Sequence, residues 1–166
     1  DMTDPSKPQV VASLDLLGYA NGIAIDGTMA YMAELTEEGA TGGKLEVVDI
    51  SNPLAPASVG VVELEGEPYD VTIKNGTAYV ATQTTGVSLV DVSVPSSPQL
   101  VTNFDSGGSC SKVDIVEDYI LGGDGIAGFF ILKQDGSELR FRSADSPADL
   151  EYKMAYQDLG LVLPQD

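Results

Sequence analysis

The sequence contains no His, no Trp and a single Cys, and each absence removes a class of chemistry. Without His, the chain cannot build a Ser-His-Asp or Cys-His catalytic centre, nor a His-ligated zinc or haem site. One Cys cannot close an internal disulfide or supply a thiolate metal cluster. Any acid–base chemistry would therefore depend on carboxyl and phenol groups.

Basic residues are also scarce. The 166 residues include 8 Lys and Arg against 26 Asp and Glu, a net charge of −18. Nucleic acids and anionic membranes attract clustered Lys and Arg, so we expect neither as a partner. The longest apolar runs, such as residues 126–132, are far shorter than the ~20 residues that span a bilayer, so we expect no membrane insertion. This acidity favours an extracellular or cell-surface protein whose signal segment lies outside this sequence; an acidic cytosolic domain is the alternative.

What the sequence does contain is an internal repeat. A Pro-x-x-Pro segment starts at Pro5, Pro53 and Pro95, with spacings of 48 and 42 residues. Residues 30–33 return as 78–81, and residues 45–51 return as 87–93, with the same two offsets. The six extra residues of the first unit fall in residues 35–43, which we interpret as an expanded loop. A degenerate third unit follows in phase, at residues 113–115 and 128–132.

Each unit is typical of four short β-strands. In the first unit the apolar segments are residues 23–25, 30–33, 45–50 and 57–64. In the second unit Asn75-Gly76 separates two apolar segments, which predicts a tight hairpin because both turn residues must adopt positive φ. Four strands in about 42 residues match a propeller blade. A solenoid is the second interpretation, and an immunoglobulin-like sandwich would not repeat at this period.

Residues 45–56, Leu-Glu-Val-Val-Asp-Ile-Ser-Asn-Pro-Leu-Ala-Pro, resemble the LVIVD-repeat signature, an apolar stretch ending in Asp-Val-Ser-Asp-Pro-x-x-Pro. Residues 18–25 and 78–81 are similar to the rest of that repeat. The resemblance covers about residues 4–133 and is weakest in the third unit. It implies β-propeller blades in a secreted or surface-anchored microbial protein, and it implies no particular reaction.

We therefore expect an all-β protein with about three blades of four antiparallel strands and an extra edge strand at residues 9–16. Residues 138–142 would form the outermost strand of the third blade. The blades would occupy residues 1–144, in units of about 4–50, 51–92 and 93–144. Propellers close with 4–8 blades, so three form an incomplete ring with two open apolar faces. We expect self-association, or the remainder of a larger propeller, to cover them.

Residues 145–166 depart from the repeat and form a tail or cap in this interpretation. Ser146 followed by Pro147 and Asp149 is typical of a helix N-terminus. A strand hairpin within residues 150–156 is the alternative.

In a propeller, the loops before the innermost strands gather around the central channel, where ligands commonly bind. The candidate ligand-binding residues at this loop face are Tyr19, Asn21, Tyr69, Asp70 and Lys112. Asp70 and Lys112 share one repeat position, which predicts an ion pair between neighbouring blades. The structural interpretation of that pair is a salt bridge that lines the channel, and the functional interpretation is a contribution to ligand binding. The partner at this face would be a protein or a glycan.

Other conspicuous residues have structural interpretations. Asp49 and Asp91 end apolar strands before the Pro turns and are expected to cap those turns by accepting backbone N–H bonds. Cys110 is expected to be a buried or idle thiol. The Gly-rich segment 122–128 precedes no helix, so it does not predict a phosphate site. No EF-hand spacing is present, and we expect neither a metal nor a cofactor.

These observations favour a non-catalytic extracellular repeat module that acts as a scaffold or a binding surface. The alternative is a segment of a carbohydrate-active or other carboxylate-using propeller enzyme, with Tyr69 and Asp70 as acid or base. The first unit has Asn21 and Gly22 where the second has these residues, so the pair is not reinforced between units. We therefore assign no catalytic residue. A third possibility is one segment of a larger catalytic subunit whose function lies elsewhere.

Overall fold

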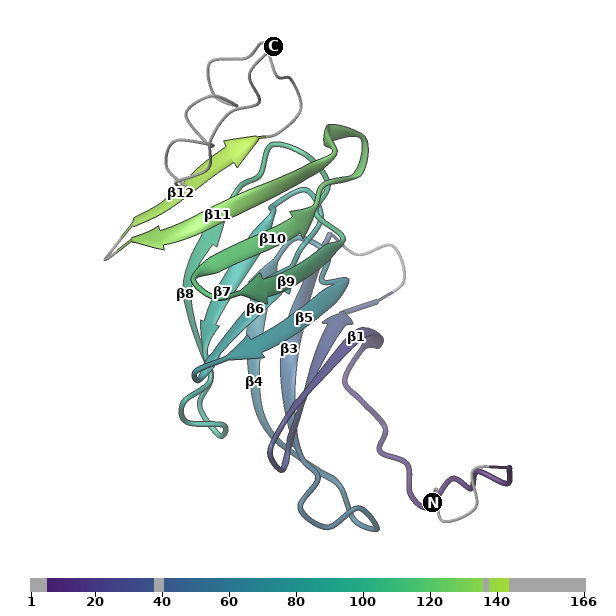
Figure 1. Ribbon diagram of the computed structural model, residues 1–166. Helices are drawn as coiled ribbons and strands as arrows, with labels where there is room; N and C mark the ends of the chain where they lie inside the picture. Colours follow the sequence, from purple (N-terminus) through teal and green to yellow (C-terminus); the bar gives the residue numbers. More distant parts are fainter. Residues whose placement is uncertain (1–5, 38–40, 136–137, 144–166) are drawn as a thin grey trace.

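The computed structural model describes residues 6–37, 41–135 and 138–143. Within these residues, twelve strands form three antiparallel sheets of four strands each, and within each sheet consecutive strands are neighbours. We call the sheets blades 1, 2 and 3 in chain order. Figure 1 shows them following one another from the purple to the yellow end of the chain.

The strand bounds follow the repeat. Blade 1 consists of β1 (Tyr19–Asp26), β2 (Met29–Leu35), β3 (Gly42–Asp49) and β4 (Ala57–Glu65). Blade 2 consists of β5 (Asp70–Lys74), β6 (Thr77–Ala81), β7 (Val87–Asp91) and β8 (Gln99–Phe104). Blade 3 consists of β9 (Lys112–Val116), β10 (Tyr119–Gly123), β11 (Phe129–Asp135) and β12 (Glu138–Ser143), with a 3-10 turn (Gly125–Ala127) before β11.

The turns form where the sequence places turn residues. Asn75 and Gly76 adopt φ of 51° and 75° between β5 and β6, which confirms the predicted hairpin. The Asp49 carboxylate accepts the Ser51 N–H at 2.8 Å, and the Asp91 carboxylate accepts the Ser93 N–H at 2.9 Å. Both predicted caps are confirmed. These bonds hold the pKa of Asp49 and Asp91 below the usual value, because they favour the ionised carboxyl group.

Each blade packs on the next through apolar side chains. One buried cluster joins blade 1 to blade 2, with Tyr31, Leu45 and Val47 facing Val71, Val80 and Val90. A second cluster joins blade 2 to blade 3 through the equivalent positions, with Tyr79, Val87 and Leu89 facing Val113, Ile120 and Phe130. We call the side of a blade that faces the preceding blade its N-face, and the side that faces the following blade its C-face.

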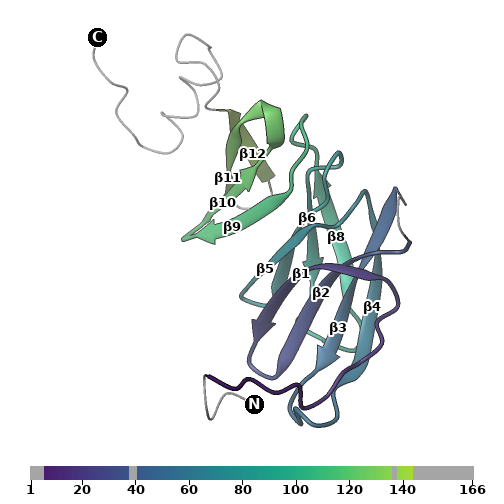
Figure 2. The same cartoon turned by 90° about the vertical axis from the view of Figure 1, so that its right-hand side faces the viewer.

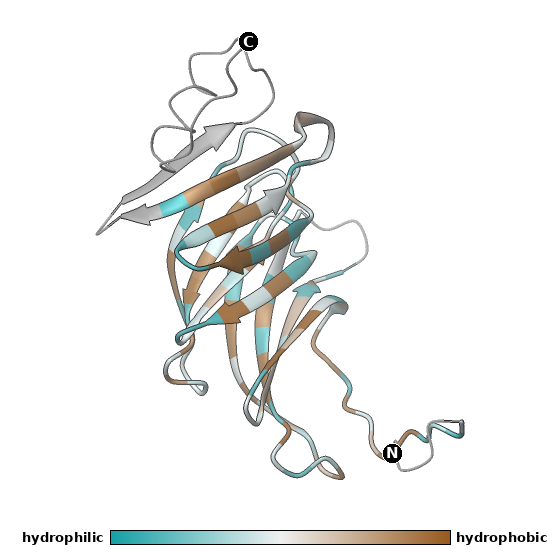
Figure 3. Ribbon diagram, viewed as in Figure 1, coloured by the Kyte–Doolittle hydropathy of each residue, from teal (hydrophilic) through white to brown (hydrophobic). Residues whose placement is uncertain are grey.

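The innermost strands β1, β5 and β9 lie side by side, since β5 contacts both of the others (Figures 1 and 2). This arrangement confirms propeller-like blades in an incomplete ring. Two faces have no adjoining blade among the described residues: the N-face of blade 1 and the C-face of blade 3. Figure 3 shows hydrophobic segments along β9, β10 and β11 of the latter blade.

The structure differs from expectation at the N-terminal side. Residues 9–16 were expected to form an edge strand, but no strand is assigned to them. A strand requires a hydrogen-bonded neighbour, and the sheet they would join is missing from the part of the chain that the structure describes. They instead run in an extended path along the N-face of blade 1, with Ala12, Leu14 and Leu16 partly covered (Figure 2).

The other boundaries differ in smaller ways. The expected loop at residues 35–43 is shorter, because β3 begins at Gly42. Each sheet includes the strand after its Pro turn, as predicted for the fourth segment of the first unit, although the unit bounds 4–50, 51–92 and 93–144 placed that strand in the next unit. β12 forms at the position predicted for the outermost strand of the third blade. The tail 145–166 lies outside the described residues.

Candidate functional site

The predicted site residues lie near the starts of the innermost strands. Tyr19, Asp70 and Lys112 are the first residues of β1, β5 and β9, and Tyr69 immediately precedes β5. Gly22, Asp70 and Lys112 occupy one register position, since each pairs with the equivalent residue of the second strand of its blade, Ala33, Ala81 or Gly123. The repeat therefore brings three different residues, two of them charged, to the same place on successive blades.

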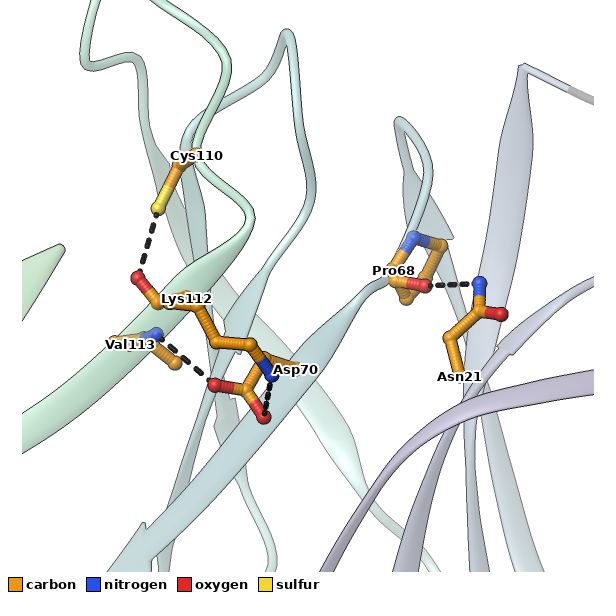
Figure 4. A network of polar contacts seen from close by, with 6 residues as sticks. All are labelled: Asn21, Pro68, Asp70, Cys110, Lys112 and Val113. Atoms are coloured by element: carbon orange, nitrogen blue, oxygen red, sulfur yellow. Dashed lines mark hydrogen bonds and ion pairs between the residues drawn. The ribbon is translucent and has the colours of Figure 1, made fainter. Parts of the chain in front are cut away.

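Asp70 connects blade 2 to blade 3 through two contacts (Figure 4). Its Oδ2 accepts the Val113 N–H at 3.2 Å, and its Oδ1 lies 3.6 Å from Lys112 Nζ. The predicted ion pair is therefore present. The Asp70 side chain is 22% exposed and that of Lys112 is 74% exposed, so the ion pair itself adds little stability. The hydrogen bond to a partly buried backbone N–H makes Asp70 an inter-blade link.

Asn21 forms a similar link between blades 1 and 2. Its Nδ2 donates to the Pro68 carbonyl oxygen at 3.0 Å, just before β5 (Figure 4). A β-bulge between Ala20 and Gly22 leaves Asn21 out of register and turns its side chain toward the neighbouring blade. Gly22 permits this close approach, because a Cβ there would lie 2.8 Å from the Asp70 Cα.

The two tyrosines are not part of these links. Tyr19 is exposed at the start of β1. The Tyr69 backbone N–H donates to the Ala81 carbonyl at 2.8 Å, which fixes the start of β5. The structure thus joins Asp70 to Lys112 and engages Asn21 separately, one blade away.

A groove opens beside the Asp70–Lys112 pair, on the C-face of blade 3. Its volume is about 410 Å³, and its apolar floor is formed by Leu121 and Phe129. Lys112, Asp70 and Asp114 supply charges of both signs at its rim. Phe129 is 49% exposed. This combination of an apolar floor with a charged rim suits the binding of a side chain or a strand from another molecule.

A second set of residues was not identified from the sequence. Glu34, Thr82 and Asp124 lie at or just beyond the end of the second strand of each blade, and all three are buried. Each lies beneath a glycine in the connection that leads into its blade, namely Gly18, Gly66 or Gly108. A Cβ on any of these glycines would clash with backbone or side-chain atoms at the end of the second strand or just after it. The glycines are spaced by 48 and 42 residues, and so are the buried polar residues. This shared offset was the signal that could have revealed them.

Glu34 is the charged member of that set. Its side chain is fully buried, and the nearest cation, Lys44 Nζ, is 3.9 Å away. Burial, together with the charge of the buried Glu46, raises the pKa of Glu34 to about 7, although Lys44 opposes the shift. Among the described residues, neither oxygen of Glu34 forms a well-aligned hydrogen bond, although the Glu46 carboxyl group and the Gly18 backbone lie close enough to affect the pKa of Glu34. The Leu17 N–H donates to Glu46 at 3.3 Å, which holds residues 9–18 over these carboxyl groups.

Cys110 is buried, as predicted. Its backbone forms a bridge with Gln83 of blade 2, and its Sγ faces the Lys112 carbonyl at 3.5 Å. The pKa of the thiol is raised to about 12. The larger cause is burial, and the second is the negative charge of Asp124. The thiolate is the reactive form, so this Cys is a packing residue.

A comparison with protein families settles the relation suggested by the repeat. The family profile described as LVIVD repeat matches residues 17–63 and 65–106, more than half of the chain. The chain belongs to the LVIVD-repeat family. The two LVIVD matches coincide with blades 1 and 2, and blade 3 is the degenerate unit. No curated protein sequence matches the chain. Within the described residues, no helix is long and apolar enough to cross a membrane.

Proposed function

We propose that this LVIVD-repeat protein is a non-catalytic extracellular or cell-surface module that acts as a scaffold by binding a protein partner. The observation that carries this proposal is the groove beside Asp70 and Lys112. Leu121 and Phe129 offer an apolar floor for an anchoring side chain, and Lys112 and Asp114 offer charges at the rim. The strong acidity and the near absence of Cys support the location.

The contacts of the predicted residues favour binding over catalysis. Asp70 already holds a backbone N–H and a lysine, and Asn21 holds a backbone carbonyl, so both stabilise the blade interfaces. An acid–base pair needs a carboxyl group with a shifted pKa facing the cleft. Glu34 has a raised pKa, but it lies under residues 9–18 on blade 1 and does not line the groove.

A protein partner suits the groove better than a glycan does. An apolar floor with a charged rim resembles the anatomy of protein interfaces, in which aromatic residues occupy the centre. Sugar recognition would require more hydrogen-bonding side chains on that floor than Leu121 and Phe129 provide.

Binding to arrays of peptides and of glycans tests the proposal. The unaltered protein should bind peptides that combine apolar and charged residues, and Phe129→Ser should reduce that binding at least tenfold. Val101→Ser is the matched control, because Val101 is exposed on β8 in another blade. Peptide binding that is equal in all three proteins would overturn the proposal. So would glycan hydrolysis that is lost in Asp70→Asn, because that result would show an enzyme.

A further inference from the structure

The two unpaired faces are the two halves of one interface that the chain already forms twice. At each existing interface, Tyr and an aliphatic residue on the C-face of one blade cover a β-branched residue on the innermost strand of the next. Tyr31 and Leu45 cover Val71, and Tyr79 and Val87 cover Val113. Val71 and Val113 are consequently only 5% and 6% exposed.

The equivalent residue on blade 1 is Ile23. Ile23 has the same register in blade 1 as Val71 and Val113 have in blades 2 and 3. Each of the three pairs with the equivalent residue of the second strand of its blade, which is Met32, Val80 or Gly122. Ile23 is nevertheless 59% exposed, and Ile25, two residues along the same face, is 63% exposed. Within the part of the chain that the structure describes, the innermost strand of the N-face of blade 1 therefore has no cover, although residues 9–18 cover the other strands of that face.

The surface that would cover Ile23 and Ile25 is the groove on blade 3. Its floor residues Leu121 and Phe129 occupy the repeat positions of Tyr79 and Val87, which cover Val113 within the chain. The groove is thus the place where the innermost strand of a following blade would lie. An Ile side chain at the position of Ile23 has the apolar character that this floor requires.

Charge opposes this pairing less than it opposes the alternative. Blade 1, residues 19–65, carries eight acidic residues and one basic residue. Blade 3, residues 112–143, carries six acidic residues and four of the eight basic residues of the chain, so its net charge is −2 against −7 for blade 1. The register places Lys112 and Lys133 on its C-face with Leu121 and Asp114. Placing this face against blade 1 brings two lysines to the most acidic blade, whereas pairing two copies of blade 1 would oppose the strongest like charges.

Lys112 also has a polar role at such an interface. Asn21 and Asp70 each bind backbone at the start of the next blade, and Lys112 occupies the same end of blade 3. Asn21 donates to the Pro68 carbonyl, and the residue equivalent to Pro68 in blade 1 is Ala20. The ammonium group of Lys112, 74% exposed, can donate to that carbonyl of an incoming strand.

We propose that the partner is a second copy of this chain: the C-face of blade 3 of each copy receives β1 of the other at Ile23 and Ile25. Two head-to-tail contacts of this kind join two sets of three blades into a ring of six, within the range of closed propellers. This inference rests on the proposed function, because it names the protein that the groove binds.

Solution mass tests the inference. Light scattering coupled to size-exclusion chromatography should report twice 17.3 kDa for the unaltered chain, falling to 17.3 kDa on dilution. Ile23→Asp and Phe129→Asp should each be monomeric at concentrations where the unaltered chain is dimeric. Val101→Asp is the matched control and should remain dimeric, since Val101 is 63% exposed on β8, away from both faces. Circular dichroism melts should show that all variants fold.

Mixing the two monomeric variants tests the head-to-tail geometry. Each variant keeps one intact half of the interface, so an equimolar mixture should form a heterodimer through a single contact. A symmetric dimer that used one face twice would not be rescued in this way. No recovery of dimer in the mixture would overturn the head-to-tail arrangement.

The failure of this inference is distinguishable from the failure of the proposed function. A mass of 17.3 kDa at all concentrations overturns the second copy as the partner, and peptide binding that depends on Phe129 would then still support a binding module. A chain that becomes dimeric only after deletion of residues 145–166 would show that its own tail covers the groove, which also overturns the inference.

Discussion

A carboxyl group buried beside another carboxyl group makes stability depend on pH, and Glu34 is that group. Its pKa is raised from 4.5 to about 7, first by burial and second by Glu46. The folded state therefore binds the proton more tightly than the unfolded state does. Stability from this group is fully present below pH 4.5 and is lost as the pH rises through about 7.

Glu34→Gln should remove this dependence, because the amide has the shape of the protonated acid and never ionises. We expect the variant to exceed the unaltered chain in free energy of unfolding by about 3 kcal/mol above pH 7, and to show no gain below pH 4.5. Urea titrations at both pH values measure the difference. Glu63→Gln is the control, since Glu63 is exposed on β4 in the same sheet and should have no such effect. A gain that is equal at both pH values would contradict the mechanism.

The turn-capping aspartates depend on pH in the opposite direction. The Ser93 hydroxyl first, and the Ser93 N–H second, lower the pKa of Asp91 from its usual 3.8 by hydrogen bonding, so the folded state favours the carboxylate. The stabilisation is present above pH 3.8 and is lost as the pH falls through the lower folded value. Asp91→Ala should lower the melting temperature at neutral pH and differ less from the unaltered chain near pH 2. A difference that does not shrink on acidification would exclude the carboxylate as the cause.

At the scale of the elements, the contact between neighbouring innermost strands depends on glycine at one position. A Cβ at Gly22 would lie 2.8 Å from the Asp70 Cα and 2.9 Å from the Tyr69 carbonyl oxygen. Both obstacles are backbone atoms of β5 or its approach, so neither can rotate away. Gly22→Ala should force β1 and β5 apart and lower the free energy of unfolding by about 1–3 kcal/mol.

Gly42→Ala is the matched control for this prediction. Gly42 lies in β3 of the same sheet, and the nearest atom to its Cβ position is the Leu64 carbonyl oxygen at 3.8 Å, an ordinary contact. Alanine there should change stability by less than about 0.5 kcal/mol. Urea unfolding of both variants measures the difference. Equal effects would show that the approach of β1 to β5 tolerates a methyl group.

The elements also show how far the sequence alone could predict this fold. Strands and turns were predictable where local chemistry repeats: Asn75-Gly76, the Asp caps and the Pro turns form at the expected places. The ion pair of Asp70 with Lys112 was predictable because a shared repeat position places both on neighbouring innermost strands. These features depend on nearby residues or on the period itself.

Other features depend on what lies across space, and a single sequence does not show that. Residues 9–16 have the pattern of a strand, but a strand also needs a neighbour to bond with. Glu34 immediately precedes residues 35–43, which were expected to form a loop, yet it is buried under Gly18 of a distant segment. The blade count predicted an open C-face on blade 3, but the groove on that face depends on how Leu121, Phe129 and the charged residues around them lie in space, which the sequence does not show.

At the scale of the whole molecule, the net charge of −18 opposes compactness. The repulsion is uneven, since the eight acidic residues and one basic residue of blade 1 concentrate it there. Dissolved salt screens such charges over about 10 Å at 0.1 M and about 3 Å at 1 M. Stability should therefore rise steeply with the first additions of NaCl and then level off as screening becomes complete.

The shape of that rise separates screening from general salting-out. Exclusion of salt from the protein surface strengthens apolar burial and grows steadily with concentration, without a plateau. The melting temperature of Ile23→Asp should rise steeply at low NaCl concentrations and then level off. This variant is used because it is expected to be monomeric, so association cannot contribute to its stability. Sucrose is the control, as it is excluded from the surface but carries no charge, and it should give only a straight line. A linear response to NaCl, or a melting temperature that falls at low salt additions, would mean that attractive ion pairs such as Asp70–Lys112 outweigh the repulsion among the acidic residues.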